Sequence, residues 1–170
     1  MGNIYLVGMM GSGKSSVAKC LAEQLGRSWI DVDEEIVKAS GQSINTLFEK
    51  KGETVFRQIE KEVLARIAQQ KNAVVATGGG SVLLAENRER MKETGVAVYL
   101  KVDLETLFKR VKLMSHRPLL KATDPKVVLA QLLRDRETFY QQVDIVLDGS
   151  GSVEKVCQEV LRLLNEKGIW

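Results

Sequence analysis

GMMGSGKSS, residues 8–16, is the stretch that decides the fold of this chain. Gly8, Gly13, Lys14 and Ser15 within it satisfy the phosphate-loop pattern G-x-x-x-x-G-K-[ST]. Glycines let successive N–H groups of such a loop point at phosphate oxygens, and the helix that follows adds a partial positive charge at its N-terminus. The pattern therefore predicts a nucleoside triphosphate site between a strand and a helix.

The sequence on either side of the loop supplies that strand and that helix. The run at residues 3–7 is apolar, and beyond the loop Val17, Leu21 and Leu25 share one helical face. Four more apolar runs are predicted as strands, at residues 28–32, 73–76, 96–100 and 144–147. Because helical stretches alternate with them, we predict an α/β fold with a five-stranded parallel sheet covered by helices on both faces.

Length and composition limit the possible functions. A chain of 170 residues suffices for one well-buried domain, and its net charge of +3 comes from interleaved acids and bases without a basic face. The start lacks a signal-peptide layout, and no run approaches the ~18 apolar residues of a membrane span. Cys20 and Cys157 have no C-x-x-C partner, which indicates neither a zinc site nor a disulfide framework. We expect a cytoplasmic protein without nucleic-acid or membrane partners.

Two acids follow the second predicted strand. Asp31 and Asp33 stand at its carboxyl end, where ligands of open α/β sheets gather, and two residues apart in a strand they point the same way. One carboxylate near Ser15 is suited to hold Mg²⁺, and the other to accept a proton from an attacking hydroxyl. An N-cap role for Asp33 is the alternative.

Two arginines stand in unusual places. Arg136 falls inside an apolar helical stripe, between Leu132 and Phe139, so its charge needs an anion. That anion is either an internal carboxylate or a substrate carboxylate, which the guanidinium fork matches. Arg57 lies within helical reach of Glu53 and Glu60, and ordinary helix ion pairs are its simpler interpretation.

A polar stretch and a glycine run complete the candidate site. Residues 112–125 form a connection of about 14 residues with weak periodicity, a length that is usually functional. We predict a basic lid that closes over the triphosphate, the alternative being a solvated loop. In VVATGGGSV, residues 74–82, three glycines end an apolar run, which predicts a close approach of substrate or phosphate to the backbone rather than a plain turn.

The segments GMMGSGKS, DVDEEI, FRQIE, TGGGSV, RPLL and RDRETFY resemble the shikimate kinase family in identity, order and spacing over essentially the whole chain. The resemblance implies a three-layer P-loop kinase fold of the nucleoside monophosphate kinase type. It implies one domain over residues 1–170, with a substrate-binding region at 33–61 and a lid at 111–124. The implied activity is that of an ATP:shikimate 3-phosphotransferase, which makes shikimate 3-phosphate and ADP in aromatic amino-acid synthesis, and we expect a monomer.

The resemblance also implies roles on the acceptor side of the site. By position, Asp33 is similar to the residue that binds the ring hydroxyls of shikimate and acts as the base. Arg57 and Arg136 resemble the pair that grips the substrate carboxylate, and Glu60 the acid that orients the first of them. Gly78, Gly79 and Gly80 match a family motif that faces substrate and γ-phosphate.

Roles on the nucleotide side follow in the same way. Lys14 and Arg117 are expected to act on the transferring phosphates, and Arg110 to stack on adenine. Ser15 and Asp31 are the expected magnesium ligands. The expected nucleotide-binding residues of the loop are Gly11, Ser12, Gly13, Lys14, Ser15 and Ser16. After the last predicted strand, this chain reads LDGSGSVEK where family members often place a basic residue near the adenine.

Competing functions remain open at the level of sequence. One is a kinase for another small hydroxylated acceptor such as gluconate, or for a nucleoside monophosphate. Another is a nucleotide switch without enzymatic activity, in which ATP orders the lid for a partner. The acid pair beside the phosphate loop favours an enzyme.

Overall fold

The computed structural model of the protein describes residues 2–113 and 124–169. Five parallel strands form one sheet in the order β2-β3-β1-β4-β5. The strands are β1 Asn3–Val7, β2 Ser28–Asp31, β3 Ala73–Ala76, β4 Gly95–Lys101 and β5 Ile145–Asp148. The predicted α/β fold with its parallel sheet is confirmed, and every strand boundary lies within one residue of its expected place.

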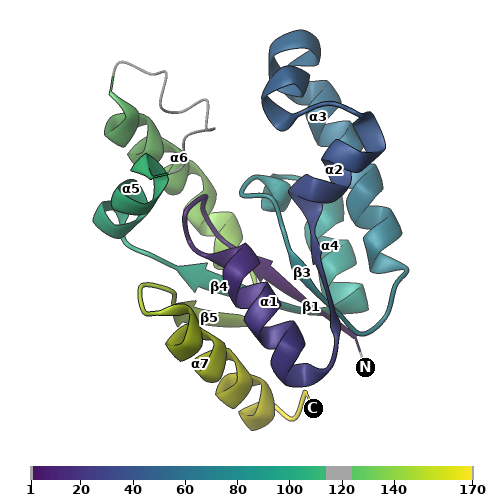
Figure 1. Ribbon diagram of the computed structural model, residues 1–170, viewed down its shortest axis with the longest axis vertical. Helices are drawn as coiled ribbons and strands as arrows, with labels where there is room; N and C mark the ends of the chain where they lie inside the picture. Colours follow the sequence, from purple (N-terminus) through teal and green to yellow (C-terminus); the bar gives the residue numbers. More distant parts are fainter. Residues whose placement is uncertain (1, 114–123, 170) are drawn as a thin grey trace.

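Seven α-helices of the described chain cover the sheet (Figure 1). They are α1 Lys14–Leu25, α2 Val32–Ser40, α3 Ile44–Ala68, α4 Ala85–Thr94, α5 Leu104–Lys112, α6 Pro125–Tyr140 and α7 Val153–Glu166. A short 3-10 helix, η1 Ser81–Leu83, follows β3. Helices α1 and α7 pack on one face of the sheet and α3, α4 and α6 on the other, which makes three layers.

The central strand β1 shows why both faces must be covered. All five of its residues are buried. Tyr5 and Val7 belong to the core beneath α3 and α6, whereas Ile4 and Leu6 belong to the core beneath α1 and α7. An apolar strand with this alternation is stable only when helices cover both of its faces.

The strand order places two loops side by side. The chain leaves β1 for the phosphate loop and leaves β3 for the three glycines, and β1 and β3 are hydrogen-bonded neighbours. Because parallel strands share their carboxyl edge, both loops emerge at the crevice where α/β proteins bind ligands. Helices α2 and α3 stand on one side of this edge, and α5 and α6 on the other (Figure 1).

The predicted helical segment after β2 is helical but interrupted. Gly52 inside α3 has φ 76° and ψ 171°, so the chain turns sharply there before the helix resumes. Only glycine adopts this backbone conformation readily. The turn separates the first part of α3, which carries Ile44 and Phe48, from the part that carries Arg57.

The lid prediction falls largely outside the described residues. Helix α5 already occupies part of the expected segment and ends at Lys112, and α6 begins at Pro125. Positions 114–123, which include Arg117, lie outside the described residues. The assignment of regions 33–61 and 111–124 therefore stays a prediction.

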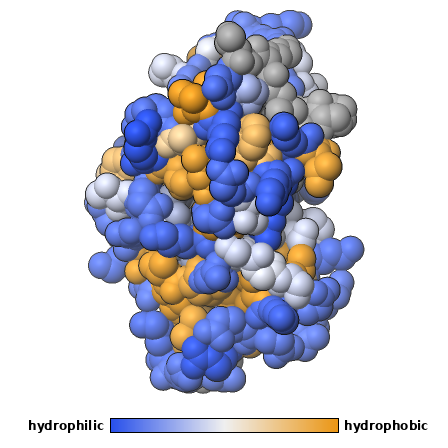
Figure 2. All heavy atoms as spheres, turned by 90° about the vertical axis from the view of Figure 1, so that its left-hand side faces the viewer, coloured by the Kyte–Doolittle hydropathy of each residue, from blue (hydrophilic) through white to orange (hydrophobic). Residues whose placement is uncertain are grey.

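One surface away from the crevice is partly apolar. Figure 2 shows the side of the molecule that carries the edge strand β5, with an apolar area among polar side chains, and Val146 of β5 is 46% exposed.

Two free thiols lie where α1 packs against α7. Cys20 of α1 is partly buried and Cys157 of α7 is fully buried. Burial and the neighbouring Cys20 thiol raise the pKa of Cys157 to about 12. Within the described part of the chain, no helix is long and apolar enough to cross a membrane.

Candidate active site

The phosphate loop has the backbone that its glycines predict. Gly11 and Gly13 have φ values of 79° and 89°, a region where side chains are strained. Lys14 is 9% exposed and turns back onto its own loop, where its Nζ donates to the carbonyl oxygens of Gly8 at 2.8 Å and Met9 at 2.9 Å. A triphosphate entering the loop would offer this ammonium group stronger, charged acceptors.

A small cavity of about 110 Å³ lies at this loop. The residues that line it come from the loop, from the end of β2 and from the segment after β3: Met10, Gly11, Gly13, Lys14, Ser15, Ser16, Asp31, Asp33, Thr77 and Gly79. The expected loop residue Ser12 is buried beside this cavity and does not line it. All the side chains that were expected to handle phosphate, except Arg110 and Arg117, therefore lie in or next to one space.

The two acids after β2 are arranged differently from the prediction. Strand β2 ends at Asp31, and Asp33 already lies in the first turn of α2, so the expected alternation along one strand is wrong. Asp31 is the N-cap of α2, because its Oδ1 accepts from the N–H of Asp33 at 2.9 Å and of Glu34 at 3.4 Å. The alternative of a capping role for Asp33 is therefore wrong as well, and both carboxylates still reach the cavity.

Asp31 also contacts the phosphate loop. Its Oδ2 accepts a hydrogen bond from Ser15 Oγ at 2.5 Å. A hydroxyl and a carboxylate side by side are oxygen donors of the kind that Mg²⁺ prefers, and this ion commonly keeps water and substrate phosphates as its other ligands. No cluster of three or more acidic, histidine or cysteine side chains suited to a metal occurs in residues 2–113 and 124–169.

A second cavity of about 300 Å³ adjoins the first. Its lining mixes apolar side chains with charged ones: Met10, Asp33, Ile44, Phe48, Glu53, Phe56, Arg57, Glu60, Gly78, Gly79, Gly80, Leu132 and Arg136. Met10, Asp33 and Gly79 line both cavities and thus form the junction between them. A cavity of similar volume at the amino ends of β1 and β4 lies at the opposite edge of the sheet from this loop.

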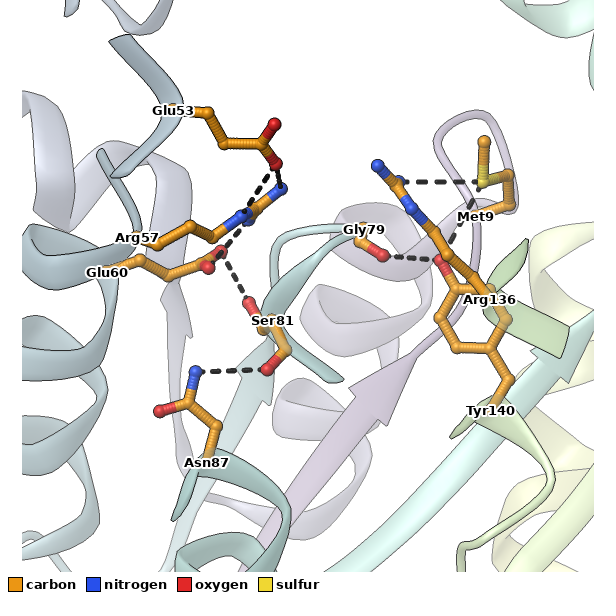
Figure 3. Close-up of polar contacts among 9 residues, drawn as sticks. All are labelled: Met9, Glu53, Arg57, Glu60, Gly79, Ser81, Asn87, Arg136 and Tyr140. Carbon is orange, nitrogen blue, oxygen red and sulfur yellow. Dashed lines mark hydrogen bonds and ion pairs between the residues drawn. The ribbon is translucent and has the colours of Figure 1, made fainter. Parts of the chain in front are cut away.

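Arg57 is held by two glutamates, as Figure 3 shows. Its Nη1 donates to the fully buried Glu60 at 2.7 Å, and its Nη2 lies 3.2 Å from Glu53. Glu60 in turn accepts a hydrogen bond from Ser81 Oγ at 2.7 Å. The predicted helix ion pairs are confirmed, and they aim the guanidinium into the larger cavity.

Arg136 has the opposite environment. It is 9% exposed on the buried face of α6, and its Nη1 lies 3.9 Å from the sulfur of Met9. Among the residues described, no carboxylate forms an ion pair with it, so the predicted alternative of an internal acid finds no support there. A buried cation that faces a cavity and has no carboxylate partner among the described residues indicates an anionic ligand.

Each of the three glycines has a different close neighbour. A Cβ on Gly78 would lie 2.6 Å from Glu60 Oε1, and a Cβ on Gly80 would lie 2.2 Å from Arg57 Nη2. A Cβ on Gly79 meets nothing closer than the backbone nitrogen of Met10 at 3.4 Å, but it would enter the junction of the two cavities. Gly78 and Gly80 therefore make room for the charged pair, and Gly79 for a ligand.

These glycines also present their backbone to the site. Within the described part of the chain, the N–H groups of Gly78, Gly79 and Gly80 donate no hydrogen bond. The carbonyl oxygens of Gly78 and Gly80 accept from Ser81 and Leu83, which starts η1. Adjacent unused N–H groups at a cavity form an anion-binding concavity.

Arg110 joins the phosphate loop to the segment after β5. Its guanidinium donates to the carbonyl oxygens of Gly11, Gly149 and Ser150, at 3.4, 3.2 and 3.0 Å. Adenine stacking by Arg110 stays a prediction, and Arg117 lies outside the described residues. The segment after β5, which departs from the family pattern, is thus held to the nucleotide side of the site by Arg110.

Sequence patterns did not single out Met9 or Met10, although Met9 contacts Arg136 and Met10 lines the site. Both are variable positions of the phosphate-loop pattern. Met10 lines both cavities, and the buried sulfur of Met9 lies near Arg136 and Tyr140. Glu53 was expected as a helix partner of Arg57, a local signal that does not reveal the cavity.

Comparison with known proteins agrees with this geometry. The family model for shikimate kinase matches residues 10–165. The shikimate kinase of Thermodesulfovibrio yellowstonii is 42% identical over 172 residues, covering 98% of this chain and 99% of the relative. That of Persephonella marina is 44% identical over 162 residues, covering 95% and 98%.

Solved structures give the same result. Shikimate kinase from Acinetobacter baumannii in complex with shikimate has a TM-score of 0.94 and 38% identity, covering 98% of this chain and 94% of that chain. A gluconokinase from Sinorhizobium meliloti has a TM-score of 0.61 and 21% identity over 97% of this chain and 92% of its own, a likeness of fold alone.

Proposed function

Because this chain belongs to the shikimate kinase family, we propose that its larger cavity binds shikimate and that its phosphate loop presents ATP. The enzyme phosphorylates the 3-hydroxyl of shikimate, which yields shikimate 3-phosphate and ADP, in aromatic amino-acid synthesis. The observation that carries the proposal is Arg136, a buried cation without a carboxylate partner among the described residues, at a cavity that adjoins the phosphate loop.

The carboxylate of shikimate binds Arg136 in this proposal. A planar guanidinium matches a carboxylate with two parallel hydrogen bonds. Arg57 faces the same cavity but already holds Glu53 and Glu60, so its contribution to the acid is the smaller one. The ring hydroxyls point toward Asp33 and the N–H groups of the three glycines, which line the same space.

The transfer takes place at the junction of the two cavities. The 3-hydroxyl oxygen forms a bond to the γ-phosphorus while the bond from that phosphorus to the bridging oxygen of ADP breaks. Asp33, which lines both cavities, accepts the hydroxyl proton. Lys14 exchanges its loop carbonyls for phosphate oxygens and so balances the charge of the transferring group.

Other groups complete the nucleotide side. Ser15 and Asp31 hold Mg²⁺, which when bound neutralises part of the phosphate charge. Arg117 of the proposed lid acts on the phosphates, and Arg110 stacks on adenine from its position at the phosphate loop.

We also propose that the protein acts as a monomer in the cytoplasm, with ATP and shikimate as its partners and without nucleic acid or membrane. Size-exclusion chromatography with light scattering tests the monomeric state.

Substrate identity is tested by following ADP release with Mg²⁺ and ATP in the presence of shikimate, gluconate, AMP or no acceptor. We expect release that depends on shikimate. Equal rates with and without shikimate would overturn the proposal, and preference for gluconate or AMP would reassign the acceptor.

Two variants test the assigned roles. Arg136→Ala is expected to raise the KM for shikimate strongly and leave ATP affinity nearly intact, because of the two substrates Arg136 contacts only shikimate in this proposal. Arg134→Ala is the matched control and is expected to behave like the parent, because Arg134 lies on the outer face of α6 and its hydrogen bond within the described chain goes to Gln131. Asp33→Asn is expected to lower kcat far more than nucleotide binding, and a parental kcat would exclude its role as base.

A further inference from the structure

Tyr140, the last residue of α6, is fully buried and directed at the glycine run. Its hydroxyl donates to the carbonyl oxygen of Gly79, and Figure 3 shows the ring rising from α6 toward that carbonyl. The ring also stacks on Tyr99 of β4, with centroids 4.9 Å apart. This side chain therefore joins the core beneath the sheet to the middle of the glycine run.

The position of the hydroxyl is central to the site. It lies 3.7 Å from the sulfur of Met9 in the phosphate loop, and the same sulfur lies 3.9 Å from Arg136. A phenol carries one proton, and the carbonyl oxygen of Gly79 is a far better acceptor than a thioether. Burial raises the pKa of Tyr140 to about 12, so the phenol remains a donor throughout the physiological range.

The contact fixes the direction of a peptide group that has no side chain to hold it. In a trans peptide the C=O of Gly79 and the N–H of Gly80 point in opposite directions. Glycine tolerates many backbone orientations, so a run of three glycines needs an external contact to select one. With its carbonyl held by Tyr140, the peptide turns the N–H of Gly80 away from the Tyr140 hydroxyl, and Gly80 itself lines the larger cavity.

The end of the run is held separately. Ser81 Oγ donates to Glu60 at 2.7 Å, and Asn87 Nδ2 donates to the carbonyl oxygen of Ser81 at 3.0 Å. These bonds fix the start of η1, and Tyr140 alone among the described side chains holds the carbonyl of Gly79. The backbone orientation of Gly79, at the junction of the two cavities, thus depends on the Tyr140 hydroxyl.

We propose that Tyr140 is a positioning residue for phosphoryl transfer, which holds the Gly79–Gly80 peptide so that its N–H faces the reacting groups. It touches neither substrate and acts through Gly79. The proposal rests on the function proposed above, since its effect is read in shikimate turnover.

Tyr140→Phe removes the one oxygen and keeps the stacked ring. Tyr99→Phe is the matched control, because Tyr99 is equally buried, belongs to the same stack and donates its hydroxyl to Glu137 at 2.7 Å, away from the cavities. We expect Tyr140→Phe to lower kcat roughly 10- to 100-fold, as small misplacements of positioned groups do. The KM for ATP is expected to stay within about twofold of the parent. Tyr99→Phe is expected to keep the parental kcat, although it too loses a part-buried hydrogen bond, in its case to a carboxylate.

A second measurement does not depend on turnover. In protein labelled with ¹⁵N-glycine and saturated with shikimate, the Gly80 amide resonance is expected to broaden or shift in Tyr140→Phe and to stay in place in Tyr99→Phe. Urea unfolding of both variants shows how much stability each has lost.

The outcomes separate the two proposals. A parent without shikimate-dependent ADP release overturns the proposed function, and the role of Tyr140 with it. An active parent with an equally active Tyr140→Phe, or an equal loss of kcat in both variants, overturns the positioning role alone. If Tyr140→Phe does not fold while Tyr99→Phe does, the hydroxyl is a requirement of the fold and the positioning role is likewise rejected.

Discussion

The two arginines of this site have the same chemistry but opposite environments. Arg57 is satisfied by Glu53 and Glu60 before any ligand arrives, whereas Arg136 has no carboxylate partner among the described residues. A charge that is already paired gains little from a further anion, while a buried unpaired charge gains much. The two arginines therefore differ in what each contributes to stability and to binding.

Arg136→Met should make the ligand-free protein more stable. The substitution replaces a buried charge by an apolar side chain of similar length, and we expect the free energy of unfolding to rise by roughly 1–3 kcal/mol. Urea denaturation measures this change, and shikimate should no longer stabilise the variant. Arg134→Met, on the exposed face, is the control and should change neither quantity; a destabilised Arg136→Met would show that the cation has a partner.

Gly80→Ala should displace Arg57 without unfolding the protein. The new Cβ would lie 2.2 Å from Nη2 and 2.5 Å from Cζ, but these atoms end a flexible side chain that can move aside. Because Arg57 is already paired, the lost contact is a modest one, and the KM for shikimate should rise roughly 2- to 10-fold. Steady-state kinetics at saturating ATP measure the KM, and circular dichroism checks the fold. A parental KM would mean that Arg57 does not touch the acceptor.

At the scale of elements, strands and helices were predictable because their signals are local. Apolar runs and helical period placed β1 and β3 and the start of α1 correctly. The end of β2 was wrong by one residue, because Asp31 caps α2 and begins a helix where alternation predicted a strand. The turn at Gly52 was missed, since one glycine among good helix formers gives no local sign of its φ.

Gly52→Ala should displace the first part of α3 and weaken shikimate binding. In Gly52→Ala the side chain has open space but an unfavourable backbone, which costs about 1–3 kcal/mol. Relief of this strain moves the first part of α3, and with it Ile44 and Phe48 at the cavity, so the KM for shikimate should rise.

Gly26→Ala is the matched control for this variant. Gly26 also has a positive φ and open space, and it ends α1 far from the phosphate loop. Both variants should lose stability in thermal unfolding, but only Gly52→Ala should change the kinetics. Equal shikimate KM values in the two variants would contradict a role of the turn in shaping the cavity.

The whole molecule brings together groups that the sequence keeps apart. The phosphate loop, the glycine run and α6 lie far apart along the chain, and sheet order and helix packing place them around two adjoining cavities. The motifs were recognisable individually because each has its own spacing. Contacts such as Tyr140 with Gly79, 61 positions apart, have no local pattern and required the fold.

Shikimate should stabilise the whole chain, because it would contact α2, α3, the glycine run and α6 together. At 100 times its dissociation constant a ligand adds about 2.7 kcal/mol. For a domain of this size that corresponds to a rise in Tm of roughly 5–10 °C. Differential scanning calorimetry with shikimate and with gluconate measures the effect. No shift with saturating shikimate would place its site elsewhere.

The resting position of Lys14 has a practical consequence for handling the protein. Its ammonium group donates to the carbonyl oxygens of Gly8 and Met9, so the backbone of the loop itself satisfies this charge. Purification and storage should therefore not require added nucleotide. Arg136 has no carboxylate partner among the described residues. A small carboxylic acid in the storage buffer should therefore stabilise the protein more than ATP does.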